Sequence, residues 1–272
     1  MKLIVKKIWL ILIPLILLPS LCFAKIKMNP EGYFETHGFT FLVYHNDYLV
    51  GKRGGLQMFL HDKRVADAGE VFCLTTEGRP LIFDSKETGE RTIDLEKGLS
   101  IIPEKIMPLD INYKIICSTD GNSILVEVQL DKPIDWKEVS QFMLKLEIYP
   151  REYQYKTYRG GQFSGYFPER YMGKMMLIPA AREILIAPED DLRAFTIITE
   201  DAQLRLIDGR GQGSNNGFMI FASPPVNSSQ QQFSMKITPR INPQWQREPV
   251  IQVSQVGYHP DQKKVAVLEL DS

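Results

Sequence analysis

Tyrosine and arginine are concentrated in one short part of this 272-residue chain, between Tyr149 and Tyr171. Eight aromatic residues fall within these 23 positions, and charged residues lie between them. Ligand sites usually combine apolar surface with a few polar groups, and a sugar needs both, because its C–H face stacks on a ring while its hydroxyls form hydrogen bonds. Aromatic rings also fill sandwich cores or dock on other domains, which is the competing interpretation. The candidate glycan-binding residues are Tyr153, Tyr155, Tyr158, Arg159, Tyr166 and Tyr171.

Other residue groups that could do chemistry are weaker. The glycine-rich stretch from Gly209 to Gly217 lacks the Gly-Lys-Ser/Thr ending of a phosphate loop and leads into a strand, so it predicts a hairpin loop. The acidic groups at 189–191 and 200–201 could supply oxygen ligands to calcium, but solvated turn charges explain them better. No Gly-x-Ser-x-Gly segment supports an esterase. The sequence therefore predicts no catalytic residue, no metal and no cofactor.

The cysteines and histidines give little indication of a metal site. Cys73 and Cys117 are far apart in segments that look like strands, without the spacing of metal ligands. An oxidising compartment permits a disulfide between them, and two buried thiols are an equally good interpretation. The chain has only four histidines, so a zinc site has few ligands to draw on.

The N-terminus has the layout of an export signal. Three lysines precede an apolar run from Ile8 to Leu18, and a small residue, Ala24, marks a cleavage point. The run is shorter than the ~20 residues that span a bilayer, which disfavours an uncleaved anchor. Lipidation at Cys22 is the remaining alternative, disfavoured by the bulky leucine before it. We therefore expect residues 1–24 to be a signal peptide, with no membrane span after cleavage, and the protein to be periplasmic, cell-surface or extracellular.

The charge balance excludes a nucleic-acid partner. The chain carries 32 basic and 33 acidic residues, and loss of the three signal lysines leaves 29 basic against 33 acidic. A mildly acidic protein has no electrostatic footprint for binding phosphate backbones.

Short apolar or alternating runs separated by turn residues fill the rest of the chain. Residues 123–130 alternate with period two, as a half-buried strand does, and Asp120-Gly121-Asn122 before them predicts a hairpin turn. Helical signals are limited to Asp135–Gln141 and Pro188–Leu192. More than ten strands without βαβ alternation predict an all-β fold, a large antiparallel β-sandwich over residues 25–240. The runs include 39–44, 56–61, 71–75, 113–117, 124–130, 142–149, 182–186, 195–199, 204–207, 218–222 and 233–237.

The pattern changes after residue 240. Residues 241–249 are polar and proline-rich, which indicates an extended linker. Two further strands are expected, at 250–256 and 264–270, with a turn between them. Because two strands are marginal alone, we expect 250–272 to be the start of an incomplete domain.

This C-terminal part carries a family resemblance. Gln255-Val256-Gly257-Tyr258 and Pro260 follow a strand and precede a Lys-Lys pair and an apolar strand. The pattern resembles the opening of the immunoglobulin-like domain of bacterial family 9 glycoside hydrolases, which are cellulases. Residues 25–248, with the segment 54–66 in particular, resemble the extra N-terminal β-domain of some members.

The resemblance implies a function without placing an active site here. The family uses two aspartates of an Asp-Ala-Gly-Asp motif and a distant glutamate, and hydrolyses glycosidic bonds with inversion. The segment from Asp67 to Glu70 has the sequence Asp-Ala-Gly-Glu, which departs at its last position and precedes the immunoglobulin-like segment. We expect a tight turn there.

The leading hypothesis is an exported, non-catalytic accessory β-domain of a cellulase-like glycoside hydrolase. Its expected partners are β-glucan or another polysaccharide and the downstream immunoglobulin-like and catalytic domains. The alternative is a free-standing periplasmic or surface glycan-binding protein. A small hydrolase that uses Asp67 and Glu70 as its acids is the least favoured interpretation.

Overall fold

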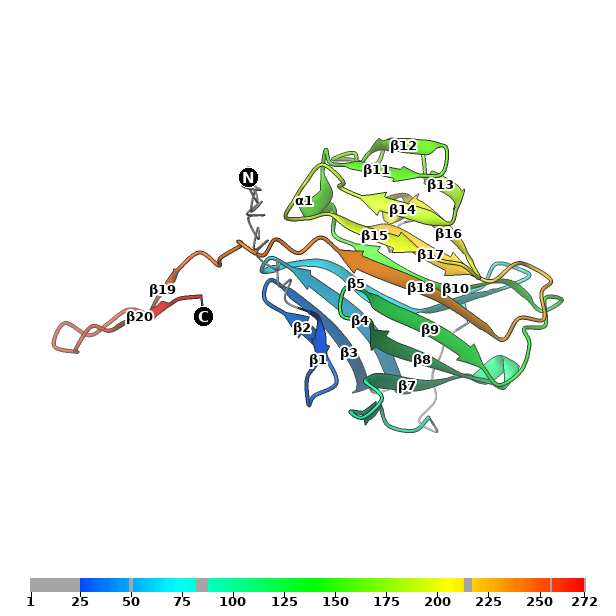
Figure 1. The fold of residues 1–272 in the computed structure, drawn as a ribbon, viewed down its shortest axis with the longest axis horizontal. Coiled ribbons are helices and arrows are strands. Elements are labelled where there is room, and N and C mark those ends of the chain that lie inside the picture. Colours follow the sequence, from blue (N-terminus) through cyan, green and yellow to red (C-terminus); the bar gives the residue numbers. More distant parts are fainter. Residues whose placement is uncertain (1–24, 49–50, 82–87, 213–216, 255, 272) are drawn as a thin grey trace, which may run out of the picture.

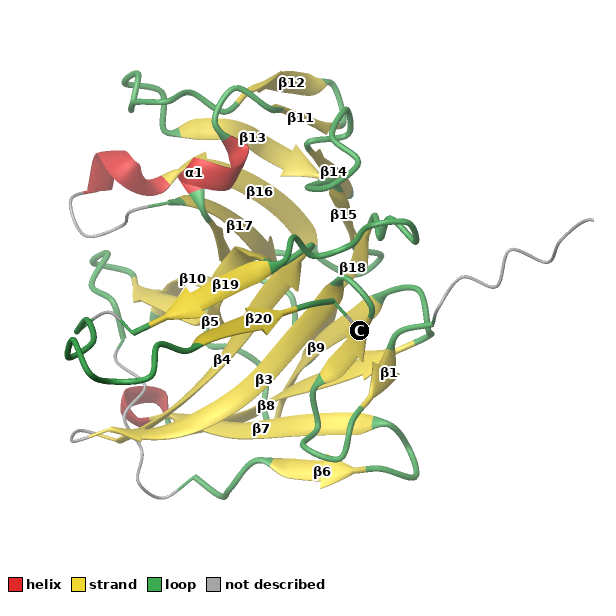
Figure 2. Cartoon of the chain, turned by 90° about the vertical axis from the view of Figure 1, so that its left-hand side faces the viewer, coloured by secondary structure: helices red, strands yellow, loops and turns green. Residues whose placement is uncertain are grey.

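The protein is a two-layer β-sandwich, as the sequence predicts. The computed structural model describes residues 25–48, 51–81, 88–212, 217–254 and 256–271, so the predicted signal peptide, 1–24, lies outside the described residues. Two nine-stranded antiparallel sheets pack face to face, and a separate two-stranded hairpin follows them (Figure 1, Figure 2).

The strands of each sheet come from many parts of the chain. The first sheet has the order β1 (Lys27–Met28), β2 (Phe34–Thr36), β3 (Phe39–Tyr48), β4 (Gly51–Leu60), β5 (Lys63–Thr75), β10 (Val139–Ile148), β17 (Phe218–Ser223), β16 (Gln203–Asp208) and β13 (Met176–Ala181). The second has the order β12 (Phe163–Tyr166), β11 (Thr157–Gly160), β14 (Glu183–Ile186), β15 (Phe195–Ile198), β18 (Gln232–Pro239), β9 (Ile124–Leu130), β8 (Ile111–Thr119), β7 (Leu99–Ile106) and β6 (Thr92–Asp94). The hairpin is β19 (Val250–Val253) and β20 (Ala266–Glu269).

The clearest local prediction, the β8–β9 hairpin, is confirmed. Buried and more exposed residues alternate along β9, so one face of the strand enters the core. The turn contains Gly121 with a φ of 92°, a conformation that favours glycine. The Asp120 carboxylate accepts hydrogen bonds from the backbone N–H groups of Asn122 and Ser123, at 2.9 and 2.8 Å. This side-chain cap closes the turn.

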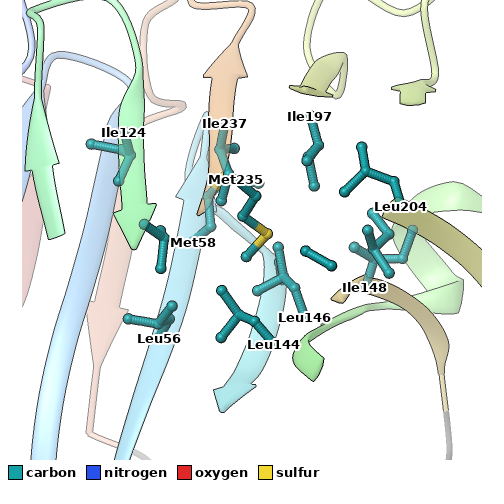
Figure 3. Close-up of a cluster of buried hydrophobic side chains, with 14 of the residues drawn as sticks. Leu56, Met58, Ile124, Leu144, Leu146, Ile148, Ile197, Leu204, Met235 and Ile237 are labelled. Atoms are coloured by element: carbon teal, nitrogen blue, oxygen red, sulfur yellow. The ribbon is translucent and has the colours of Figure 1, made fainter. Parts of the chain in front are cut away.

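The core lies between the two sheets and is almost entirely aliphatic and aromatic. Figure 3 shows its central part, where side chains from both layers meet. The residues labelled there are Leu56, Met58, Leu144, Leu146, Ile148 and Leu204 from the first sheet, and Ile124, Ile197, Met235 and Ile237 from the second. All ten are fully buried.

The prediction of two helices, at 135–141 and 188–192, is wrong. The 135–141 stretch is a turn that runs into β10, because Val139 pairs with Thr75 of β5 and is drawn into the sheet. The 188–192 stretch is also a set of turns, in which the Asp190 carboxylate accepts a hydrogen bond from the backbone N–H of Leu192 at 2.8 Å. The described part of the chain has instead one short α-helix, α1 (Pro150–Tyr153), and the 3-10 turns η1 (Met107–Leu109) and η2 (Gly209–Gln212). Among the described residues, no helix is long and apolar enough to cross a bilayer.

The open question about the cysteines is answered in favour of two buried thiols. Cys73 lies on β5 and Cys117 on β8, and both are free and fully buried. Burial raises the pKa of Cys73 to about 12 and raises that of Cys117 as well. Both groups therefore pack as small apolar side chains.

A buried histidine fastens the segment after β18 to the sandwich. His61 and Asp62 form the two-residue turn between β4 and β5, with φ of 49° and 61°, as a type I′ hairpin requires. The two ring nitrogens of His61 lie 2.9 Å from the Leu192 carbonyl oxygen and 3.0 Å from the backbone nitrogen of Asn242. The Trp245 ring lies 5.4 Å from the His61 ring. The predicted linker, 241–249, has no strand or helix, and its first half is anchored here.

Acid should weaken this anchor. The bond pattern requires a neutral imidazole, with Nδ1 donating to Leu192 and Nε2 accepting from Asn242, and burial lowers the pKa of His61 below 6.5. Below pH 6.5 the unfolded chain takes up a proton at this position before the folded protein does, so stability is lost as the pH falls from 6.5 toward the folded pKa. Urea unfolding at several pH values should show a smaller loss over this window in His61→Gln than in the wild type. The exposed His259 supplies the control: His259→Gln should keep the wild-type pH dependence.

The C-terminal hairpin projects from the sandwich with its apolar residues exposed (Figure 1). Gly257 has a φ of 81°, so the predicted tight bend in the family motif is present. The Tyr258 hydroxyl donates a hydrogen bond to the Val265 carbonyl and joins the two ends of the loop. Val256 is 99% exposed and Pro260 is exposed, whereas Gln255 lies outside the described residues.

Candidate functional site

The aromatic-rich segment forms one edge of the second sheet. It runs from the end of β10 through α1 into the hairpin β11–β12, and β12 is the edge strand (Figure 1). Tyr158 lies opposite Gly165 in this hairpin. A β-carbon on Gly165 would come within 2.5 Å of the Tyr158 hydroxyl oxygen, so the glycine makes room for the ring. The sequence therefore builds an edge hairpin with one ring-filled face.

The inward half of the segment is core, which corrects part of the predicted site. Tyr153 is fully buried and Tyr158 is 4% exposed. Their ring centroids lie 5.9 and 5.1 Å from that of Phe167, which lies 4.6 Å from Phe218. The Tyr153 hydroxyl donates to the Arg193 carbonyl at 3.1 Å, and burial raises the pKa of Tyr153 well above its usual value. Tyr153 and Tyr158 cannot stack on a ligand, because the core already covers both rings.

The outward half is free surface. Tyr155 is 66% exposed and Tyr166 is 60% exposed. Arg159 and Tyr166 share the outward face of β11–β12, and neither makes a side-chain hydrogen bond to a described residue. The backbone N–H of Tyr155 bonds to the carbonyl of Phe167, which follows Tyr166 directly. Arg159 and Tyr166 thus share one face of the hairpin, and the exposed Tyr155 adjoins its end; we call these three residues the edge surface.

Glu169 positions the Tyr155 ring on the edge surface. The Tyr155 hydroxyl donates to the Glu169 carboxylate at 2.6 Å, and this bond raises the pKa of Tyr155. The hydrogen bond gives the ring a defined direction. Tyr171 lies further along, 39% exposed, with its ring against Gly211.

The segment after β12 is held by an arginine that the sequence did not single out. Arg210 forms a two-bond pair with the buried Asp208, at 2.8 and 2.7 Å. Its guanidinium also donates to the carbonyls of Pro168 and Glu169 and lies 4.5 Å from the Phe218 ring centroid. We call Arg210 and Asp208, with the two carbonyls that Arg210 binds, the clamp. Residues 213–216 of the glycine-rich stretch lie outside the described residues.

The Asp-Ala-Gly-Glu segment is a bulge inside β5, not a turn between two strands. Asp67 pairs with Glu147 and Glu70 with Lys145, so two residues of β5 face one of β10, and Ala68 takes a positive φ of 48°. A turn does not form because the ladder to β10 continues on both sides.

Both carboxylates of the bulge are already engaged. Asp67 accepts hydrogen bonds from the Tyr149 hydroxyl at 2.9 Å and from the backbone N–H of Ala68 at 2.6 Å. Glu70 forms an ion pair with Lys145 at 2.8 Å. Each carboxylate thus has a structural partner, and the pair lies on a strand of the first sheet.

The other acidic groups also have structural partners. Glu189 accepts hydrogen bonds from the backbone N–H and the hydroxyl of Thr157, and Asp190 pairs with Lys156 at 2.7 Å. Asp201 accepts from the backbone N–H of Ser234 at 2.9 Å. Across the described ranges, no three His, Cys, Asp or Glu side chains cluster as metal ligands.

The sequence did not predict a groove on the outer face of the first sheet, the face turned away from the core. A second apolar cluster lies there on β5, β10, β13, β16 and β17, and it comprises Phe72, Met143, Met176, Ile207, Met219 and Phe221. Two adjoining hollows of about 600 and 410 Å³ open over this face, and both are lined by Gln141 and Arg205. One sequence feature could have indicated an apolar outer face. Residues 218–222 are a continuous apolar run, which is typical of a strand covered on both faces.

Comparison with known proteins assigns the chain to no family. No family model matches the sequence, and no curated protein matches it. Among solved structures, the chain is similar to the Slr1438 protein from Synechocystis sp. PCC 6803, with a TM-score of 0.34 and 9% sequence identity. The match covers 72% of this chain and 95% of that chain. The likeness is too weak to support an argument about function, and the resemblance to family 9 glycoside hydrolases remains a prediction.

Proposed function

We propose that this protein is an exported, non-catalytic β-domain that binds a glycan for a cellulase-like glycoside hydrolase. The observation that carries the proposal is the edge surface, where Tyr155, Tyr166 and Arg159 stand exposed on a hairpin backed by core. Rigid rings beside a free guanidinium offer a sugar both a stacking plane and hydrogen-bond donors. A neutral β-glucan is the expected ligand, because the flat faces of its rings match such planes.

The state of the acidic residues supports a non-catalytic role. A glycoside hydrolase needs two carboxylates on opposite sides of the scissile bond, one of them free to act as an acid. Asp67 and Glu70 instead hold Tyr149 and Lys145 in the first sheet. Export is supported by the residue pattern of 1–24.

The C-terminal hairpin supports an accessory rather than a free-standing role. Ile251, Val253 and Leu268 are each at least 58% exposed, and a hairpin of two strands is marginally stable by itself. In the proposed arrangement, the downstream immunoglobulin-like domain covers these side chains. A free-standing surface protein would leave them in water.

Calorimetric titration with cellohexaose tests the proposal. The purified chain should bind the oligosaccharide, and the Tyr155→Ala/Tyr166→Ala variant should bind it at least about tenfold more weakly, because removal of exposed anchor rings commonly costs more than ~1.4 kcal/mol of binding energy. Leu125→Ala is the matched control, since Leu125 is an exposed residue of β9 in the same sheet, and it should bind like the wild type.

Two results would contradict the proposal. Absence of binding to every member of a neutral glucan panel at millimolar sugar would remove the glycan-binding role. Release of reducing sugar by the purified chain, abolished in Asp67→Asn, would instead make the protein a hydrolase.

A further inference from the structure

Arg205 lies in the middle of the outer-face groove without a carboxylate partner. It is on β16, and its cross-strand neighbour is Phe221 of β17. The next neighbour in the same row is Lys145 of β10, followed by Glu70 of β5. Lys145 is neutralised by Glu70 at 2.8 Å, whereas Arg205, on the other side of Phe221, forms no ion pair with a described residue. One row of the sheet therefore carries one paired and one unpaired cation.

The guanidinium of Arg205 has few hydrogen bonds to the described residues. Arg205 is half-buried: its Nε is buried without a hydrogen-bond partner among the described residues, and its Nη2 donates a long hydrogen bond to the Met143 sulfur, at 3.6 Å. Burial lowers the pKa of Arg205, since the apolar floor withdraws water from its charge. An arginine buried in this way is normally paired, because desolvating a charge without a partner is unfavourable. An anion in the groove would supply the partner that the described residues do not.

Two arginines, Arg205 and Arg182, line the groove without an ion pair to a described residue. The lining of the groove includes Arg182 and Lys145 beside Arg205, and no aspartate or glutamate among the described residues. Arg182 donates hydrogen bonds to the backbone carbonyls of Glu200 and Ala202. These acceptors are neutral, so they do not neutralise its positive charge. A guanidinium fork can form two parallel hydrogen bonds with the oxygens of a carboxylate, as it can with those of a phosphate.

The remaining lining suits a ligand with rings and hydroxyls. The Trp136 indole N–H donates to the Ser228 carbonyl at 2.9 Å, so this ring is fixed in the larger hollow. Gln141, Gln203 and Ser223 place amide and hydroxyl groups around Arg205. Each hollow falls in the ~300–1,000 Å³ range of ligand pockets.

We propose that the groove binds an acidic oligosaccharide, with a uronate carboxylate paired to Arg205 and an adjoining sugar ring in the hollow beside Trp136. This inference shares with the proposed function the premise that the ligand is a glycan. It uses a different face of the molecule and different residues, so the two can fail separately.

Binding measurements with the full chain test the inference. Trigalacturonate should bind, while its methyl ester, cellohexaose and acetate should not bind in the groove. Arg205→Met should weaken trigalacturonate binding at least about tenfold, because a charge-assisted bond is lost. Arg205→Lys should weaken it less, since the charge remains but the two-oxygen fork does not. Arg240→Met, the same change at an exposed arginine, should leave binding unaltered.

The thermal midpoint separates a binding role from a structural one. Methionine matches the apolar floor, so Arg205→Met should melt at or above the wild-type temperature, and Arg205→Lys provides a second folded variant if it does not. The inference is overturned if trigalacturonate does not bind, if it binds equally to Arg205→Met, or if the methyl ester or acetate competes equally. Trigalacturonate binding that is lost in Tyr155→Ala/Tyr166→Ala but retained in Arg205→Met would show that the acidic ligand binds at the edge surface. That result would also overturn the inference.

Discussion

Replacement of Tyr153 by alanine is expected to destabilise the sandwich by about 3–5 kcal/mol, the range seen when a large buried aromatic residue is removed. Tyr153 is fully buried and touches Phe167 and Phe195, with ring centroids 5.9 and 6.0 Å away. The measurement is the free energy of unfolding in urea. The effect is large because a fully buried ring and its contacts with two other aromatic rings are lost, and a cavity remains in the core.

Tyr155→Ala is the matched control for this prediction. Tyr155 is two positions away and 66% exposed, so its removal should change stability by less than about 1 kcal/mol while weakening glycan binding. Tyr153→Phe should lose about 1 kcal/mol, because only the hydroxyl bond to the Arg193 carbonyl is removed. Equal losses in Tyr153→Ala and Tyr155→Ala would contradict the division of this segment into a core half and a surface half.

The second large effect is expected at the clamp. Arg210→Met should destabilise the protein by about 3–5 kcal/mol, because removal of one partner leaves the buried Asp208 carboxylate without its ion pair. The bonds to the carbonyls of Pro168 and Glu169 are lost together with it. Thermal and urea unfolding both report this change.

Arg240→Met provides the comparison, since Arg240 also bonds to a carbonyl and a carboxylate, those of Pro188 and Asp191. That pair is exposed, so the loss should stay below about 1 kcal/mol. Asp208→Asn combined with Arg210→Met should recover part of the stability, because the unpaired charge is then absent. A loss in Arg210→Met no greater than that in Arg240→Met would show that the clamp is not a stabilising contact.

The clamp and the buried rings both support the segment that carries Tyr155. Arg210 holds the backbone at Glu169, and Glu169 in turn accepts the hydrogen bond of Tyr155. The Tyr155 ring of the edge surface is therefore positioned from the core, through one buried ion pair and one exposed hydrogen bond. Preorganised rings lose little freedom when a ligand binds, which favours binding to a surface of this kind.

The strand pattern was predictable because it is local. A period-two alternation and a turn such as 120–122 depend on neighbouring residues, and both appear where the sequence predicts them. The bulge at 67–70 was not predictable in this way. Its sequence suits a turn, but pairing with Glu147 and Lys145 continues the strand across it.

The all-β class, the main hairpins and the concentration of tyrosine between 149 and 171 could all be predicted from the residues alone. Which of these tyrosines face water depends on long-range packing, because alternation defines two faces of a strand without saying which one another sheet will cover. The same reason applies to the groove. Glu70, Lys145, Phe221 and Arg205 are distant in sequence, and the strand order β5–β10–β17–β16 alone places them in one row. In that row Lys145 forms an ion pair with Glu70, whereas Arg205 faces a groove to which the described residues contribute no carboxylate.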